Sequence, residues 1–175
     1  MHPILLKSVN LFDPEPKGVC DLFLCGGIVA AVGKNLSPAL PDVEVVDGSG
    51  LTALPGLVDQ HVHFTGGGGE CGFRSRVPEL SLTDFTTAGV TTAVGLLGTD
   101  SATRSPKSLL AKTKALNEEG ITAYCLTGAY DVPSPTVTGS LKDDVAFISE
   151  ILGVKVALSD HRSGHPSLEQ LIHMA

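Results

Sequence analysis

Two histidines separated by one residue are the strongest chemical signal in this 175-residue sequence. His61 and His63 close an apolar run that begins at Leu57. If this run is a strand, both imidazoles project to the same face, because alternate residues of a strand share a face. Two neutral imidazoles on one rigid element form half of a site for a divalent transition metal. The alternative is a hydrogen-bonded pair of histidines without a chemical role.

The residues after the histidines favour a site. The run 66–69 is four glycines, and Glu70 follows it, so flexible backbone and a carboxylate lie beside the imidazoles. Lys155 is a second unusual residue, because it lies inside the apolar run 154–158. A lysine in such a run is costly unless its ammonium group reaches water or a partner. At a strand end the side chain can simply reach water. Facing the interior, its neutral amine can react with carbon dioxide to give a carbamate, an anion able to bridge two metal ions.

These residues need elements that place them together, and four apolar runs meet that need. The runs 57–62, 91–96, 121–126 and 154–158 begin roughly 30 to 35 residues apart, the repeat length of a βα unit. Helical segments are expected between and after them, at 80–88, 106–119, 141–152 and from 167 onward. Gly89, Gly120 and Gly153 are placed to end the first three helices. Polar residues follow the strands, so we expect them to meet at the carboxyl edge of a parallel sheet.

The region 1–53 has a different pattern, with short β-like runs and turn residues. Two runs joined by Gly26 and Gly27 predict a hairpin. We therefore predict an α/β protein, with the N-terminal part of a small β-sandwich-type domain at 1–53 and four βα units at 54–175. A (β/α)8 barrel needs about 250 residues. Four units are either an open sheet or the first half of such a barrel, and composition leaves both possibilities open.

Composition limits the classes of partner and compartment. Hydrophobic residues make up 42% of the chain, which is enough for a buried core. The net charge is −7 and no cluster of Lys and Arg is present, so neither nucleic acid nor an anionic membrane is expected as a partner. The four cysteines show no CxxC spacing and are expected to be reduced thiols. With no signal peptide or membrane-length apolar run expected, we predict a cytoplasmic protein.

Seven short segments together carry a family resemblance. They read GLVDQHVH, GGGGE, VGLLGTD, LLAKT, LNEEG, LTGAY and SDHRS and lie between about residues 54 and 165. In combination they resemble the isoaspartyl (β-aspartyl) dipeptidase family of the amidohydrolase superfamily, which are metal-dependent hydrolases. The pair of histidines alone marks only the superfamily. The resemblance implies that this chain holds four βα units of a TIM barrel.

The resemblance implies a binuclear zinc centre. His61 and His63 would bind one Zn²⁺, and Lys155, as a carbamate derived from CO₂, would bridge it to a second. The complete site would hold two zinc ions, which activate a hydroxide for attack on the substrate. The family pattern takes its further metal ligands and a catalytic aspartate from later strands, which this sequence does not contain.

The resemblance also implies a dipeptide site. Glu70 would meet the free α-amino group of the isoaspartyl residue, and Gly68 and Thr99 would hold its α-carboxylate. Arg162 would bind the C-terminal carboxylate, a task that suits its planar guanidinium. Tyr130 would be catalytic and donate to the scissile carbonyl oxygen as charge develops there. Asp160 and His161 are given no catalytic role.

The expected function follows from the resemblance. This chain would be an incomplete, N-terminal portion of a zinc metallopeptidase that hydrolyses isoaspartyl dipeptides, inactive alone and a homo-oligomer at full length. One alternative is a cyclic-amide hydrolase, similar to dihydroorotase or hydantoinase. Glu70 and Arg162 favour a zwitterionic dipeptide over a cyclic amide. A second alternative is a non-catalytic fragment or binding module whose glycine run binds an anion.

Overall fold

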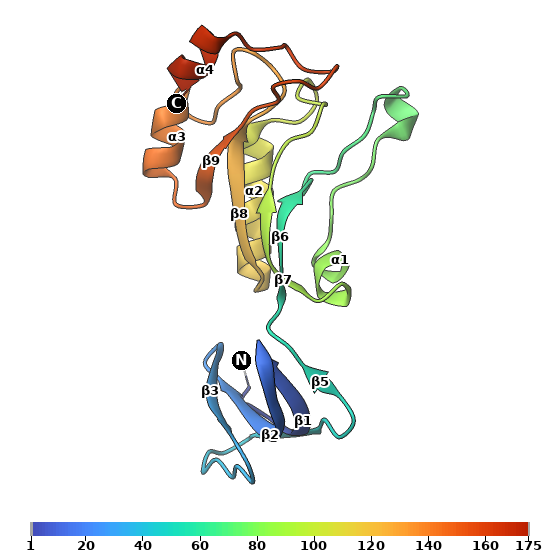
Figure 1. Cartoon of the computed structure of the whole chain (residues 1–175), viewed down its shortest axis with the longest axis vertical. Helices are drawn as coiled ribbons and strands as arrows, with labels where there is room; N and C mark the ends of the chain where they lie inside the picture. Colours follow the sequence, from blue (N-terminus) through green and yellow to red (C-terminus); the bar gives the residue numbers. More distant parts are fainter. Residues whose placement is uncertain (1, 175) are drawn as a thin grey trace. The chain divides into compact units, whose positions relative to one another are not determined.

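The chain forms two compact units, and each is described by itself (Figure 1). The structure is a computed structural model that describes residues 2–174. The first unit extends to Pro55, and the second begins at Gly56. Within the described residues, no helix is long and apolar enough to cross a membrane.

The first unit is a mixed sheet of five strands. β1 (Ile4–Asp13) and β2 (Glu15–Cys25) are its longest strands, and β3 (Ile28–Gly33), β4 (Glu44–Asp47) and β5 (Thr52–Ala53) complete it. The strand order is β3-β2-β1-β4, with β5 also paired to β1; β1 is antiparallel to β2 and parallel to β4 and β5. The predicted β2–β3 hairpin is confirmed. Its turn residues Gly26 and Gly27 both have positive φ, the conformation that tight hairpin turns require.

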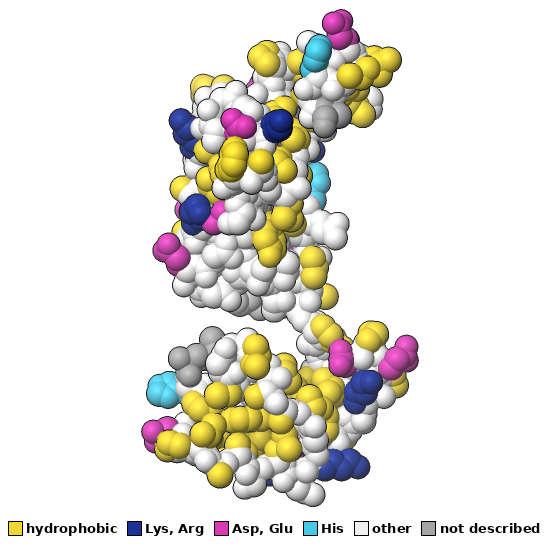
Figure 2. Space-filling view, turned by 90° about the vertical axis from the view of Figure 1, so that its left-hand side faces the viewer, with side chains coloured by type: hydrophobic (Ala, Val, Ile, Leu, Met, Phe, Trp, Pro, Cys, Tyr) yellow, Lys and Arg dark blue, Asp and Glu magenta, His cyan; other side chains and the backbone are white. Residues whose placement is uncertain are grey.

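The core of the first unit is small. Val9, Leu11, Cys20 and Leu22 are buried together. Several other hydrophobic side chains of these strands are more than half exposed, and Figure 2 shows hydrophobic atoms gathered on this unit. They are Val19, Ile28, Val29, Val32 and Val45. Exposed apolar area of this kind is typical of a site of protein contact or aggregation.

We expect the 175-residue polypeptide, produced as it stands, to self-associate through this surface. Burial of exposed apolar area between copies is favourable, and exposed strand edges add backbone pairing. Light scattering after gel filtration should show species larger than the monomer at micromolar concentration. Ile28→Lys together with Val45→Lys should reduce them. A monomer at every concentration tested would contradict this expectation.

The second unit contains four parallel strands in the order β6-β7-β8-β9. Their bounds are Leu57–Val62, Val90–Gly95, Thr122–Gly128 and Ile151–Lys155. α1 (Leu82–Thr87), α2 (Pro106–Glu119) and α3 (Leu141–Phe147) connect them, and α4 (Leu168–Met174) follows. The α/β fold class is confirmed. Strands that pair in chain order are the arrangement found along a (β/α)8 barrel, and their carboxyl ends meet at one edge.

α2 covers one face of this sheet, as Figure 1 shows. Ser105 caps its first turn by accepting a hydrogen bond from the Ser108 amide, and Pro106 opens the helix. Gly120 ends it in the left-handed conformation. Leu109 and Leu116 are fully buried and pack with strand residues such as Ala93. This core fixes the sheet beneath the polar ends of the strands.

The boundaries predicted for the fourth βα unit were wrong. The helix predicted at 141–152 ends at Phe147, and the strand predicted at 154–158 begins earlier, at Ile151. Ile148 adopts an extended backbone, and Gly153 pairs with Leu126 inside β9 instead of ending a helix. Lys155 is therefore the last residue of β9, opposite Gly128. The correction moves Lys155 to the carboxyl edge of the sheet.

Candidate active site

The two histidines lie at the carboxyl end of β6. His61 belongs to the strand and His63 follows its last residue. Their ring centroids are 5.5 Å apart. Burial is the main cause that lowers the pKa of His63, and the neighbouring His61 and Lys155 add to the effect. The His63 ring is therefore neutral near pH 7, the form that binds a metal.

The surroundings of His63 fit a metal ligand. Its Nδ1 is buried without a hydrogen-bond partner among the described residues, so this atom is unsatisfied within the protein. Gly98 borders the ring so closely that a Cβ there would lie 2.9 Å from His63 Cε1. Among residues 2–174, no group of three or more His, Cys, Asp or Glu side chains forms a metal cluster. His61 and His63 can supply part of a metal site, and other donors must complete it.

Gly98→Ala should displace the His63 ring. The added methyl group has no room beside the imidazole, and nearby Gly67 borders the ring from another side. We expect weaker Zn²⁺ binding by the variant, by about tenfold, because ligand geometry sets metal affinity. Calorimetric titration with Zn²⁺ measures this, and Gly153→Ala serves as a control, since Gly153 has no positive φ and a Cβ there would meet only Leu126 Cδ2, at 3.8 Å. Equal affinities for wild type and Gly98→Ala would contradict the assigned role of His63.

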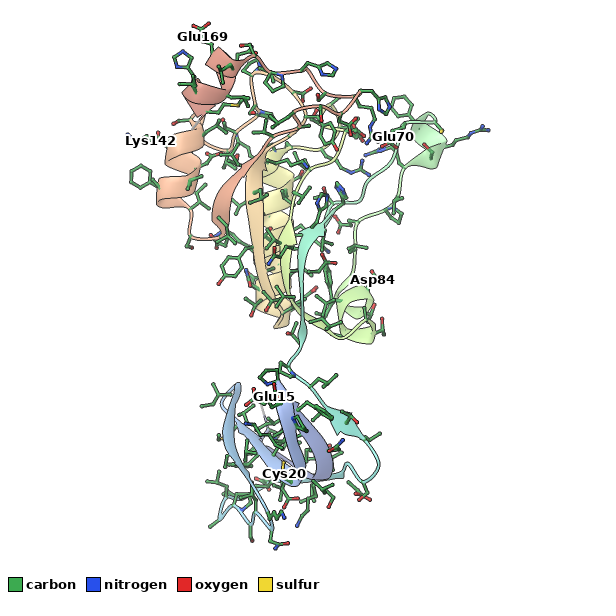
Figure 3. All side chains as sticks on the ribbon, in the orientation of Figure 1. Glu15, Cys20, Glu70, Asp84, Lys142 and Glu169 are labelled. Atoms are coloured by element: carbon green, nitrogen blue, oxygen red, sulfur yellow. The ribbon has the colours of Figure 1, made fainter. Side chains whose placement is uncertain are left out.

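A second cluster of polar side chains lies at the same edge of the sheet. Arg162 donates from its Nε and Nη2 to the two oxygens of Asp160, at 2.9 and 2.8 Å. Its Nη1 donates to Glu70 Oε1 at 2.9 Å. The Thr99 hydroxyl donates to the same Glu70 oxygen at 3.0 Å. The loops after β6, β7 and β9 therefore meet at one point, where Figure 3 labels Glu70.

The charges of this cluster stabilise one another. Arg162 holds the pKa of Asp160 well below its usual range, mainly through side-chain hydrogen bonds, and Asp160 in turn raises the pKa of Arg162. The pKa of Glu70 is lowered first by its own backbone N–H and then by Thr99. Near neutral pH the cluster therefore presents a carboxylate and a guanidinium side by side.

Tyr130 connects the two clusters. Its ring contacts two cations, with Lys155 Nζ at 5.3 Å and Arg162 Cζ at 5.8 Å from the ring centroid. Both distances are within the range of a cation–π contact. The phenol hydroxyl is 3.5 Å from Asp160 Oδ2. These contacts limit the orientation of the ring and place its hydroxyl near Asp160.

A groove of about 410 Å³ lies over the second cluster. Its lining combines backbone from the glycine run with both signs of charge: Gly68, Gly69, Glu70, Phe73, Arg76, Thr99, Asp100, His161 and Arg162. A groove that offers a carboxylate, a guanidinium and backbone N–H groups is complementary to a small zwitterion.

Comparison with known proteins agrees with this geometry, although no family model matches the chain. The β-aspartyl dipeptidase of Fervidobacterium islandicum AW-1 superposes with a TM-score of 0.90 and 44% sequence identity, over 98% of this chain and 47% of that enzyme. The same enzyme in complex with a β-Asp-Leu dipeptide superposes with a TM-score of 0.89 at 44% identity, over 98% of this chain and 45% of that one. The dihydroorotase of Solibacter usitatus is 38% identical over 64 residues, 35% of this chain and 14% of that protein.

The chain belongs to the amidohydrolase superfamily. Over nearly the whole length of this chain, it is similar to a β-aspartyl dipeptidase. It spans less than half of the length of that dipeptidase.

Most of the predicted site residues of this amidohydrolase chain converge. Gly68, Glu70, Thr99 and Arg162 line one groove. Tyr130 contacts Lys155 and Arg162, which connects the predicted catalytic, metal-binding and substrate-binding residues. His61 and His63 lie at the end of β6. Lys155 is close enough for its positive charge to lower the pKa of His63. The assigned roles stay predictions.

Two residues with several hydrogen bonds at this edge of the sheet were not among the predicted site residues. Asp160 binds Arg162 through both carboxylate oxygens and through the Arg162 amide, at 2.9 Å. The spacing of two residues, Asp-x-Arg after a strand, is the signal that could have identified it, because aspartate often accepts from the amide two positions later. Arg104 was also missed, since an arginine before a helix start is usually a surface charge.

Proposed function

We propose that this chain carries the dipeptide-recognition groups and part of the metal site of a β-aspartyl dipeptidase. The observation that carries the proposal is the pairing of Glu70 and Arg162 at 2.9 Å in one groove, from loops 92 residues apart in sequence. The similarity to the Fervidobacterium islandicum enzyme over 98% of the chain supports it.

A zwitterionic dipeptide would replace the Glu70–Arg162 pair with two new ion pairs. Its ammonium group would bind Glu70, and its C-terminal carboxylate would bind Arg162, whose planar fork suits a carboxylate. The Gly68 backbone and the Thr99 hydroxyl would hold the second carboxylate. A substrate lacking one charge would leave one of the two side chains unpaired, which costs affinity.

His61, His63 and Lys155 are the side chains that would hold zinc. The neutral, unsatisfied ring of His63 fits this role. Among residues 2–174 the Lys155 ammonium makes no ion pair and lies over the Tyr130 ring, so conversion to a carbamate would remove an unpaired cation. When bound, zinc lowers the pKa of a water molecule and polarises the amide carbonyl.

Tyr130 would act on the substrate carbonyl oxygen. Its ring contacts both Lys155, a proposed metal ligand, and Arg162, a proposed dipeptide-binding residue, and its hydroxyl lies 3.5 Å from Asp160 Oδ2. A phenol donor preorganised at this position stabilises negative charge as it develops on the oxygen. Asp160 orients Arg162 and lies 3.5 Å from the phenol, so it supports both residues.

A cyclic-amide hydrolase is the second candidate, because a stretch of the chain resembles a dihydroorotase. The groove favours the first candidate. A cyclic amide has no free ammonium group for Glu70, whose carboxylate and the Arg162 guanidinium are both available at one point.

Binding of three ligands tests the proposal: β-Asp-Leu, its α-linked isomer Asp-Leu, and dihydroorotate, each titrated calorimetrically into the zinc-treated protein. We expect β-Asp-Leu to bind at least about tenfold more tightly than the others, since the unmatched charges of the others cost affinity. N-acetyl-β-Asp-Leu, which lacks the ammonium group, is the matched control and should bind weakly. Preferred binding of dihydroorotate would overturn the proposal.

A further inference from the structure

Arg104 is a buried cation beside the proposed site. Its side chain is 7% exposed. Nε donates to the Thr65 carbonyl at 2.8 Å, and Nη2 donates to the Val77 carbonyl at 3.0 Å. Nη1 donates to Asp100 Oδ2 at 2.7 Å. One guanidinium thus joins the two ends of the 65–77 segment to the loop after β7.

The 65–77 segment is tightly folded on itself between these two anchors. Val77 donates to the Gly67 carbonyl at 2.8 Å, and Gly68 forms a β-bridge with Arg76. A Cβ on Gly66 would lie 2.1 Å from the Val77 carbonyl oxygen. The segment therefore tolerates only glycine at position 66. Glu70 lies between its two anchored ends.

Asp100 extends the connection toward the substrate groove. It accepts hydrogen bonds from the Thr103 amide and hydroxyl, and Arg76 Nε lies 3.2 Å from its Oδ2. The preceding residue, Thr99, donates to Glu70. Arg104 and Arg76 therefore act on Asp100 from two sides, and Asp100 adjoins the residue that orients Glu70.

We propose that Arg104 is a positioning residue that sets the location of Gly68 and Glu70 relative to Thr99. Three donors in a fixed planar fork reach three separate acceptors, the Thr65 and Val77 carbonyls and the Asp100 carboxylate, which the single nitrogen of a lysine cannot do. The effect on dipeptide binding rests on the proposed function. The effect on the 65–77 segment does not.

A merely structural role would have a different signature. If Arg104 only stabilised the fold, its loss would raise hydrogen exchange throughout the second unit, because all amides would open together. A positioning role predicts a local effect in the 65–77 segment.

The test is hydrogen exchange measured by mass spectrometry on Arg104→Lys and Arg104→Met. Arg104→Lys keeps the charge beside Asp100 but not all three bonds, so it remains informative if Arg104→Met fails to fold. Lys112→Met is the control, since Lys112 is also a cation of this unit, paired with Glu79 at 3.2 Å just beyond the segment. We expect peptides covering 65–77 to exchange roughly tenfold faster in the Arg104 variants, with α2 and β8 unchanged.

Unchanged exchange in 65–77, or faster exchange of α2 and β8 to the same degree, would overturn the proposal. Calorimetric titration with β-Asp-Leu is the second arm, and we expect about tenfold weaker binding by Arg104→Lys than by Lys112→Met. If the wild-type protein does not bind β-Asp-Leu, the proposed function fails, while the exchange result still decides the role of Arg104. Locally faster exchange with unaltered dipeptide affinity would show that Arg104 does not position the substrate groups.

Discussion

Asp144→Ala should reduce the free energy of unfolding by about 3–5 kcal/mol, the range expected when a buried charged group with several partners is removed. Asp144 is fully buried, at 0% exposure, and accepts four hydrogen bonds. The donors are the Thr127 hydroxyl, the Val137 amide, and the amide and hydroxyl of Thr138. Alanine would leave all four donors without this acceptor.

The measurement is urea unfolding at pH 7, with Asp143→Ala as the matched control. Asp143 is the preceding carboxylate in the first turn of α3 and is exposed. Its loss should cost less than about 1 kcal/mol, the usual contribution of a surface charge near a helix N-terminus. Similar losses for the two variants would contradict the role given to the buried carboxylate.

The same residue predicts how stability changes with pH. Burial alone would raise the pKa of Asp144, but hydrogen bonds from Thr127, Val137 and Thr138 outweigh this effect and hold the pKa below its ordinary value of 3.8. A lowered pKa means that this stabilisation is present above pH 3.8 and is lost as the pH falls through the folded-state value. The stability difference between wild type and Asp144→Asn should therefore narrow below about pH 4. A difference that stays constant to pH 2 would contradict this assignment.

Arg162→Met should abolish most of the affinity for β-Asp-Leu. Its guanidinium donates to both Glu70 and Asp160, so its loss would leave two carboxylates at the groove without this cation. We expect the dissociation constant to rise on the order of a hundredfold, as found when one member of a hydrogen-bonded charge pair is removed. Arg162→Lys should recover only part of this loss, because an ammonium cannot bind a carboxylate through two parallel donors.

Zinc content separates substrate binding from metal binding in this variant. Arg162→Met should bind as much zinc as wild type, since Arg162 contacts carboxylates and the Tyr130 ring rather than His61 or His63. Arg74→Met, which removes an exposed guanidinium from the short 3-10 helix at Phe73–Ser75, is the control for loss of positive charge. Loss of zinc in Arg162→Met would move this residue to the metal site and contradict the proposed arrangement.

The parts of the fold with clear end signals could be predicted from the sequence. β6 and α2 have the predicted bounds, because an apolar run, a Ser-Pro start and a terminal glycine mark them. The boundary between α3 and β9 could not be predicted, since Val145, Ile148 and Leu152 have a spacing that also fits a helix. Only pairing with β8 shows that Ile151 begins a strand.

The convergence of site residues could be predicted, but their pairing could not. Parallel strands bring their carboxyl ends together, which is why Glu70, Thr99 and Arg162 were expected at one edge. The contact between Glu70 and Arg162 depends on the paths of two loops. Hydrophobic periodicity predicts strands and helices but not the path of a loop. Arg104 gave no signal at all, because its role depends on carbonyl groups 27 and 39 residues away.

Activity of a chimeric enzyme tests the central claim most directly. The segment of the Fervidobacterium islandicum dipeptidase that aligns with this chain, 47% of its length, would be replaced by this chain. We expect the zinc-loaded chimera to hydrolyse β-Asp-Leu, to leave α-linked Asp-Leu intact, and to lose activity with Arg162→Met or Tyr130→Phe. A folded, zinc-loaded chimera that cleaves dihydroorotate but not β-Asp-Leu would contradict the proposed function.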